Sequence, residues 1–348
     1  VELMSDRQET RSARGKRHPT WIRLGLWGLA LALLWWAGRN IELNSIWQSF
    51  RRLSLTQLLI LTLVNIVVML TLSSRWWVVL SGLGYRVNYL SLSAYRLAAF
   101  GLSYFTPGPQ FGGEPLQIYL LRVRQDVPTT TGTASVTLEK VIELVGNFTF
   151  LLVGLALIAR LEFFKGQAGG AFIGLALLLL GLPLVLLLAI ARGMRPFSSL
   201  MKRVPRGISA RIPTWKRWQN GAMAVEVEMT VFFREKPLQL LAAMAFSLLT
   251  WVVLVAEYWL MLRFLDLNLA FDETVAVLTT ARLAFLTPLP GGLGALEAGQ
   301  GFAFQRLGYS IAEGLSVGLL IRARDVVFGA IGLALGSILA GSQFEDPA

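Results

Sequence analysis

Long apolar runs alternate with short polar segments along almost the whole chain. About 20 consecutive apolar residues cross a hydrocarbon core of roughly 30 Å, and six uninterrupted runs approach or exceed that length. The pattern therefore predicts six transmembrane helices, at 21–38, 55–80, 133–159, 170–191, 238–264 and 313–340. The expected fold class is an all-α polytopic membrane protein.

Two further apolar regions, 92–122 and 273–307, are each cut near the middle by prolines and glycines. The arm before each cut, 92–105 or 273–286, would be only about 21 Å long as a helix, too short to cross alone. Irregular backbone at membrane depth is tolerated only where protein or a water-filled cavity surrounds it. We therefore expect two re-entrant hairpins, in which a helix enters, breaks at a tip and returns.

The two broken regions share an ordered set of unusual residues, which predicts an internal duplication. Each copy has a threonine and two prolines, then a glycine pair, a glutamate, and a base-x-x-acid pair on the next span. The matched residues are Thr106, Pro107, Pro109, Gly112, Gly113, Glu114, Lys140 and Glu143 in one copy, and Thr287, Pro288, Pro290, Gly291, Gly292, Glu297, Arg322 and Asp325 in the other. An odd number of spans separates the copies, so the second copy is expected to be inverted. Inverted repeats with paired broken helices place a substrate site near the midplane, at the repeat interface.

The charge distribution predicts which side of the membrane each segment faces. Lys and Arg outnumber Asp and Glu by 32 to 21, and the basic residues concentrate in the N-terminal tail and in 192–236. By the positive-inside rule, both segments and both termini lie in the cytoplasm, so the chain belongs in the cytoplasmic (inner) membrane. Residues 192–236 are either an amphipathic helix lying on anionic lipid or a solvated loop.

The predicted organisation follows from these features. It comprises a basic tail (1–20), a first helix and loop (21–54), repeat 1 (55–191), the basic loop (192–236), repeat 2 (237–341) and a C-terminal tail (342–348).

Composition argues against most catalytic chemistry. The chain is 55% hydrophobic, has no cysteine, and has a single histidine, His18, within the basic tail. Thiol nucleophiles, disulfides and cysteine metal sites are therefore absent from the sequence, and His-based acid–base chemistry is not expected. We expect no cofactor, no metal and no catalytic residue, and the excess positive charge reflects topology rather than nucleic-acid binding.

Charged residues inside apolar spans are the sharpest functional signal, because they are costly in lipid and normally face a partner or a wet cavity. They are interpreted either as ion pairs that lock the two halves together or as ligands of an anionic substrate. The candidate substrate-binding residues are Arg96, Thr106, Gly112, Gly113, Glu114, Lys140, Arg282, Thr287, Gly291, Gly292, Glu297, Arg322 and Arg324, and the candidate coupling or structural ion-pair residues are Glu139, Glu143 and Asp325. Glu114 and Glu297 stand in the first turn of the helix that restarts after each break. There they act either as helix caps or as proton-coupled carboxylates. Glu257, within another span, is expected to have a partner that the sequence does not identify.

The stretches "FTPGPQFGGEPLQIYLLR" and "LTPLPGGLGALEAG" resemble the two signatures of a flippase-like family that includes the transmembrane region of lysylphosphatidylglycerol synthases. "LEKVIELVG" is similar to its ER-x-x-D helix, and "RARD" to the counterpart near the end. The resemblance covers nearly the whole chain after the first helix and implies a bacterial or archaeal inner-membrane protein that flips or transports lipids. Gln117 stands where the first signature usually has a basic residue. The chain ends at Ala348, soon after the last span, so the soluble aminoacyl-transferase domain and lysyl-lipid synthesis are not expected.

The function we expect is movement of a polar-headed, phosphate-bearing lipid between leaflets by alternating access, with anionic membrane lipids as partners. Three alternatives remain. They are a secondary transporter of a small soluble anion, a membrane enzyme or non-catalytic accessory of lipid or glycolipid synthesis, and a scaffold that binds partners through 192–236.

Overall fold

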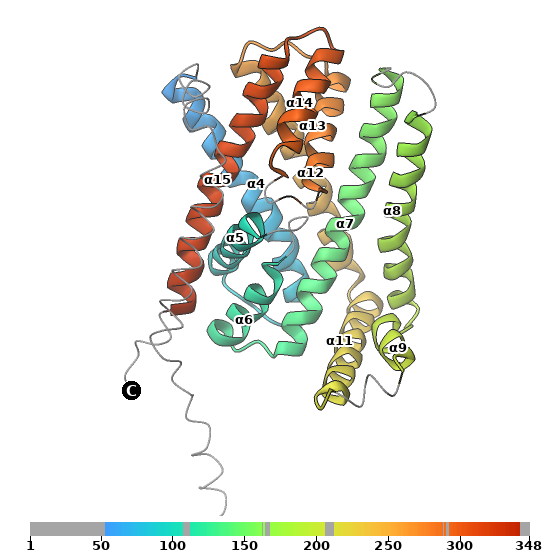
Figure 1. The fold of residues 1–348 in the computed structure, drawn as a ribbon. Coiled ribbons are helices and arrows are strands. Elements are labelled where there is room, and N and C mark those ends of the chain that lie inside the picture. Colours follow the sequence, from blue (N-terminus) through green and yellow to red (C-terminus); the bar gives the residue numbers. More distant parts are fainter. Residues whose placement is uncertain are drawn as a thin grey trace, which may run out of the picture.

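A computed structural model describes residues 53–106, 112–161, 163, 168–205, 212–287, 289 and 292–341. The expected helix at 21–38 lies outside these residues, as do Gly291 and the four tip prolines at 107, 109, 288 and 290. Within the described residues the chain is entirely helical apart from turns and loops (Figure 1). The helices are α4 (Leu55–Gly82), α5 (Tyr89–Phe105), α6 (Glu114–Gln125), α7 (Thr129–Arg160), α8 (Ala168–Ala191), α9 (Pro196–Arg203), α11 (Trp215–Glu235), α12 (Pro237–Phe264), α13 (Phe271–Phe285), α14 (Ala295–Arg306) and α15 (Ile311–Gly341).

Five of these helices, α4, α7, α8, α12 and α15, are long and apolar enough to cross a membrane. They coincide with five of the six spans that the hydrophobic pattern predicts. Many of their large apolar side chains are exposed, including Leu178, Leu182 and Leu248. An exposed apolar surface of this kind suits a lipid environment rather than water.

Both Pro/Gly-rich regions interrupt a helix where the sequence predicts a break. α5 ends at Phe105 and α6 begins at Glu114, and α13 ends at Phe285 and α14 begins at Ala295. In Figure 1 the α5–α6 pair occupies the lower half of the bundle and the α13–α14 pair the upper half. The two broken pairs therefore lie toward opposite ends of the long helices.

Eight of the helices fall into two units of four with the same spacing along the chain. The first unit is α4 to α7 and the second is α12 to α15. The step in numbering from the start of α4 (Leu55) to the start of α12 (Pro237) also separates the starts of α5 and α13 and those of α7 and α15. We call this step the common offset. Helices α4 and α12 also have the same length, 28 residues.

The turns of the two units match as well. Residues with positive φ recur at the common offset: Gly84 with Asp266, Gly112 with Gly294, and Asp126 with Gly308. Left-handed backbone is costly for residues other than glycine, so its recurrence at matched positions is informative. The units therefore share their turns in addition to their helices.

The units interlock. Helix α4 packs on α12, the first arm α5 packs on the long helix α15 of the other unit, and the first arm α13 packs on α7. Small residues allow these close crossings, as is usual in membranes. A Cβ built on Gly101 of α5 would lie 2.6 Å from the backbone nitrogen of Leu333 on α15.

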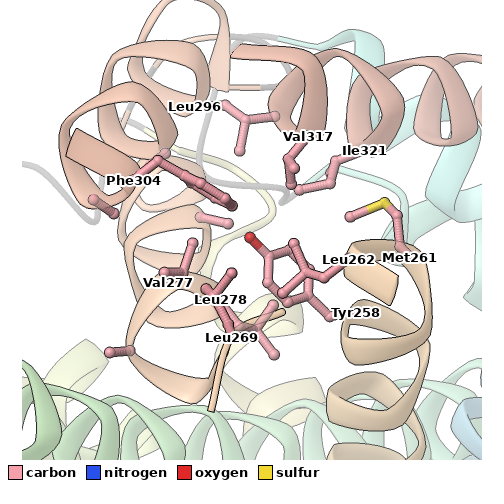
Figure 2. Close-up of a cluster of buried hydrophobic side chains, with 14 of the residues drawn as sticks. Tyr258, Met261, Leu262, Leu269, Val277, Leu278, Leu296, Phe304, Val317 and Ile321 are labelled. Carbon is pink, nitrogen blue, oxygen red and sulfur yellow. The ribbon is translucent and has the colours of Figure 1, made fainter. Parts of the chain in front are cut away.

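The largest apolar cluster lies mainly in the second unit and extends to Leu155 and Ile158 of α7 (Figure 2). Tyr258 of α12, Val277 of α13, Phe304 of α14 and Val317 of α15 converge there, and all four are almost fully buried. The Tyr258 hydroxyl donates to Oε1 of the buried Gln300 at 2.5 Å, so the polar groups in this cluster are also paired. The second unit is therefore closely packed around its own broken helix.

Residues 192–236, left open between two interpretations by the sequence, contain the helices α9 and α11. The carboxylate of Glu226 on α11 accepts hydrogen bonds from the backbone nitrogens of Phe197 and Ser198, at the start of α9. Leu200 of α9 and Trp218 of α11 are exposed, at 66% and 55%. The segment is thus a pair of docked helices with apolar residues on its outer face.

Candidate functional site

A cavity of about 270 Å³ lies between the two units. Its walls come from α4, α5, α6 and α7 of the first unit and α12, α13 and α15 of the second. The charged residues that line it are Arg75, Arg96, Glu114, Glu139, Lys140, Glu143, Arg282, Arg324 and Asp325. Charged side chains at this depth need partners or ligands, because the surrounding helices are apolar.

In the first unit, two arginines bind two glutamates. Arg75 of α4 donates to Glu139 from Nε at 2.9 Å and to Glu143 from Nη2 at 2.9 Å. Arg96 of α5 donates to the same two carboxylates at 2.9 and 3.3 Å. Arg75 and Glu139 are 2% and 3% exposed, so this is a buried ionic network that joins α4, α5 and α7. Buried ion pairs of this kind are costly to break, since each lost partner leaves a buried charge.

In the second unit, the partner of Glu257 is Arg324. Nη1 of Arg324 donates to both carboxylate oxygens of Glu257, at 2.9 and 3.0 Å, and Nε donates to Asp325 at 2.8 Å. Asn65 of α4 donates to Glu257 at 3.3 Å, which connects this second network to the first unit.

The two glutamates that follow the breaks serve equivalent roles. Glu114 accepts from the Gly112 backbone nitrogen at 2.8 Å and lies 3.3 Å from Lys140 Nζ. Glu297 accepts from the Gly294 backbone nitrogen at 3.0 Å and from Arg322 Nη2 at 2.8 Å. Each carboxylate therefore caps the turn before its helix and also pairs with a base on the following long helix.

The two bases differ in their surroundings. Lys140 lines the cavity and its side chain is 23% exposed, whereas Arg322 is outside the lining and its side chain is 3% exposed. The sequence made both Arg322 and Arg324 candidate anion ligands, but the guanidinium of Arg322 is buried against Glu297. The cavity therefore extends into the first unit and stops short of the equivalent position in the second.

Other candidate residues hold the backbone. The hydroxyls of Thr106 and Thr287 donate to carbonyls of their own helices, at Leu102 (2.9 Å) and Ala284 (2.6 Å). Gly112 and Gly292 have φ values of 134° and 62°, which fit glycine at a turn. Gly113 lines the cavity and leaves no room for a Cβ beside the backbone of Ala99.

Sequence reasoning missed several cavity residues, above all Arg75 and Trp251. Arg75 lies inside the span 55–80, and a lone base within an apolar span is itself a sign of function. Trp251 lies in the middle of the span 238–264 and lines the cavity, where its ring stacks on Phe150 at a centroid distance of 4.0 Å. Thr250 also lines the cavity, and as an uncharged residue it gave no comparable signal; Gln117, which stands where the first signature usually has a base, lines the cavity as well.

These features define a polytopic α-helical membrane protein with a charged cavity between two four-helix units. The family described as "Lysylphosphatidylglycerol synthase TM region" matches residues 21–332, and the chain belongs to this family. It is also similar to "UPF0104 membrane protein PH1989" of Pyrococcus horikoshii, with 23% identity over 309 residues, covering 84% of this chain and 89% of that protein. No solved structure matches the chain.

Proposed function

We propose that the protein moves a polar-headed, phosphate-bearing anionic lipid across the cytoplasmic membrane. The observation that carries the proposal is the cavity between the units, to which both units contribute basic side chains. About 270 Å³ is room for a headgroup and not for acyl chains. The headgroup would enter the cavity while the chains stay in the bilayer, so that the protein lowers the cost of carrying charge through lipid.

The proposed mechanism is alternating access between two inverted repeats. The common offset and the reciprocal packing of α5 on α15 and of α13 on α7 support the duplication. The position of the broken pairs at opposite ends supports the inversion (Figure 1). In such transporters, one repeat moves against the other around a site at their interface.

The proposed orientation places the α5–α6 end in the cytoplasm, and with it both termini. Bases at or near this end include Arg122, Arg124, Lys202, Arg203, Arg234 and Lys236. Asp272, Glu273 and Glu313 mark the starts of α13 and α15 at the other end. With this positive-inside arrangement, the cavity residues Gly113, Glu114 and Gln117 of the α5–α6 pair would lie toward the cytoplasmic half of the protein. The exposed apolar and basic residues of α9 and α11 would then lie on the anionic inner leaflet.

A second candidate is a transporter of a small soluble anion, which the size of the cavity favours. Under either proposal the protein is not an enzyme. The alternative role as a non-catalytic accessory of lipid synthesis needs no transport through the cavity.

The test is transbilayer movement in proteoliposomes. Fluorescent phosphatidylglycerol in one leaflet should become accessible to a membrane-impermeant quencher faster with the protein than in empty vesicles, and neutral diacylglycerol should show no protein-dependent acceleration. Arg96→Met, which removes a cavity base, should slow this movement. The matched control is Arg263→Met, which removes an exposed base outside the cavity and should behave like wild type. Uptake of labelled glycerol 3-phosphate without lipid movement would favour the soluble-anion candidate and contradict the lipid one.

A further inference from the structure

The five bases that line the cavity are not equivalent. Arg75, Arg96, Lys140 and Arg324 each have a carboxylate oxygen within 3.3 Å. Among the described residues, no ion pair and no hydrogen bond joins Arg282 to any group, and its Nε is buried without an acceptor. A buried donor without an acceptor is costly, so this side chain has the strongest need for a ligand.

Arg282 is nevertheless held in place. Its Cζ lies 5.2 Å from the centroid of the Trp251 ring, a cation–π arrangement. Trp251 in turn stacks on Phe150, with an angle of 9° between the rings. The indole contacts the guanidinium but accepts no hydrogen bond from it, so the N–H donors remain available.

The surroundings of Arg282 are apolar on its own helix. Phe285, the last residue of α13, and Leu286, which follows it, are three and four residues further along the chain, and both line the cavity. These side chains cannot solvate a guanidinium. An anion bound there would be shielded from water, where a charge-assisted hydrogen bond is strong.

The first unit does not repeat this arrangement. At the common offset, Phe100 corresponds to Arg282 and Met69 to Trp251, and both line the same cavity without carrying charge. Polar features such as the tip glutamates and their bases recur in both units, whereas this cation–aromatic pair does not. Within the described residues, the cavity therefore favours one asymmetric anion position over two symmetric ones.

We propose that Arg282, supported by Trp251, binds the phosphate of a phosphodiester headgroup. The planar guanidinium matches two phosphate oxygens, which a lysine would contact only as a point charge. The charge balance weighs against a multiply charged group. Counted with Glu257, the partner of Arg324, five bases face five acids, so the cavity has no surplus positive charge for a phosphomonoester or diphosphate. This inference deepens the proposed function and rests on it.

The experiment measures binding to delipidated protein in neutral detergent. Phosphatidylglycerol should raise the thermal unfolding midpoint of the wild type, and Arg282→Gln should weaken its apparent affinity about tenfold or more. Arg282→Lys should fall between the two. The matched control is Arg263→Gln, which removes an arginine at the same 5.2 Å from a tryptophan, Trp259, but outside the cavity. It should bind like wild type.

A second measurement separates binding from a structural role. Without lipid, Arg282→Gln should unfold at the wild-type temperature or above, because the variant loses a charge that has no carboxylate partner. A lower unfolding temperature without lipid, or unchanged affinity for phosphatidylglycerol, would overturn the assignment.

Two further arms identify the source of the phosphate and keep this inference separable from transport. Stabilisation by phosphatidylglycerol but not by soluble glycerophosphoglycerol supports a lipid headgroup, and the reverse result would overturn the lipid assignment. Arg282-dependent binding without any lipid movement would refute the flippase proposal alone. Lipid movement that is insensitive to Arg282→Gln would refute the phosphate site alone.

Discussion

Arg75 of α4 and Glu257 of α12 occupy matching positions at the common offset, with opposite charge. Each also bonds across to the other helix. Nη1 of Arg75 donates to the Ser247 hydroxyl at 3.3 Å, and Glu257 accepts from Asn65 at 3.3 Å. Asn65 and Ser247 are themselves related by the common offset, so the two contacts are equivalent. The centre of the α4–α12 contact is thus polar on both sides, and it connects the ionic network of each unit to the other unit.

Arg75→Met should destabilise the protein strongly. Removing this guanidinium leaves Glu139 and Glu143 with fewer counter-charges in a buried position, and breaking a buried pair costs about 3–5 kcal/mol. Because Arg96 still contacts both carboxylates, we expect the lower end of that range. The free energy of unfolding in mixed micelles measures the effect. Arg263→Met is the control. If Arg75→Met lowers the free energy of unfolding no more than Arg263→Met does, the network does not stabilise the fold.

Replacing the two tip glutamates should give different results despite their equivalent positions. Glu297→Gln removes a carboxylate that binds Arg322, whose side chain is only 3% exposed, so stability should fall by a few kcal/mol. Glu114→Gln leaves Lys140 with Glu143 at 3.3 Å and in contact with the cavity, so the loss of stability should be smaller and the effect should fall on transport. Unfolding midpoints and lipid movement measured on both variants test this contrast. Equal destabilisation would contradict the difference in environment between the two units.

The sequence predicts the helices well because lipid imposes simple rules on length and hydrophobicity. Predicted starts at 133 and 238 compare with Thr129 and Pro237, and the Pro/Gly clusters mark the breaks. The pairing of charges was harder to predict. Lys140 and Glu143 are one turn apart and do pair, but Asp325 pairs with its neighbour Arg324 instead of Arg322.

Most cavity contacts depend on helix packing, which a single sequence does not contain. Arg75 is 64 residues from Glu139, and Arg324 is 67 residues from Glu257. No local spacing relates such partners. The common offset relates Glu257 to Arg75, but the helix ends are needed to define that offset.

Gly154→Ala should weaken the contact between α7 and α13. A Cβ at this position would overlap the Thr279 side chain and lie 2.8 Å from its Cβ. Overpacking of this kind costs about 1–3 kcal/mol. Adding Thr279→Ala removes the hydroxyl and methyl groups in the way and should restore part of the loss. Gly174→Ala, in α8 with nothing within 4 Å, should be neutral or slightly stabilising in the same unfolding assay. An equal effect at both glycines would exclude close packing as the cause.

Glu228 should make stability depend on pH. It lies on α11, outside the candidate spans, and burial raises the pKa of its carboxyl group above 4.5, against the opposing effect of the hydrogen bond from Thr131. Between pH 4.5 and the raised pKa, the folded state binds more protons than the unfolded state, so stability falls as pH rises through this window.

Glu228→Gln should remove that decline, so the variant should gain on the wild type as pH increases. Unfolding midpoints across a pH series measure the difference, with the exposed Glu235→Gln on the same helix as control. Parallel curves for wild type and Glu228→Gln would contradict the raised pKa.

Single cysteines should report the unequal opening of the two units. The chain has no cysteine of its own, so each introduced thiol is a unique target. Leu144 of α7 lines the cavity, whereas Val326 of α15, its counterpart at the common offset, packs against the buried cluster of Tyr104, Phe105 and Leu333. A charged, membrane-impermeant thiol reagent needs an aqueous path, so it should modify Leu144→Cys much faster than Val326→Cys.

Added phosphatidylglycerol should slow the modification of Leu144→Cys by occupying the cavity. If the two units exchange conformations during transport, a state in which the cavity extends into the second unit should make Val326→Cys react faster than Leu144→Cys. Equal rates under all conditions would contradict the unequal opening of the two units.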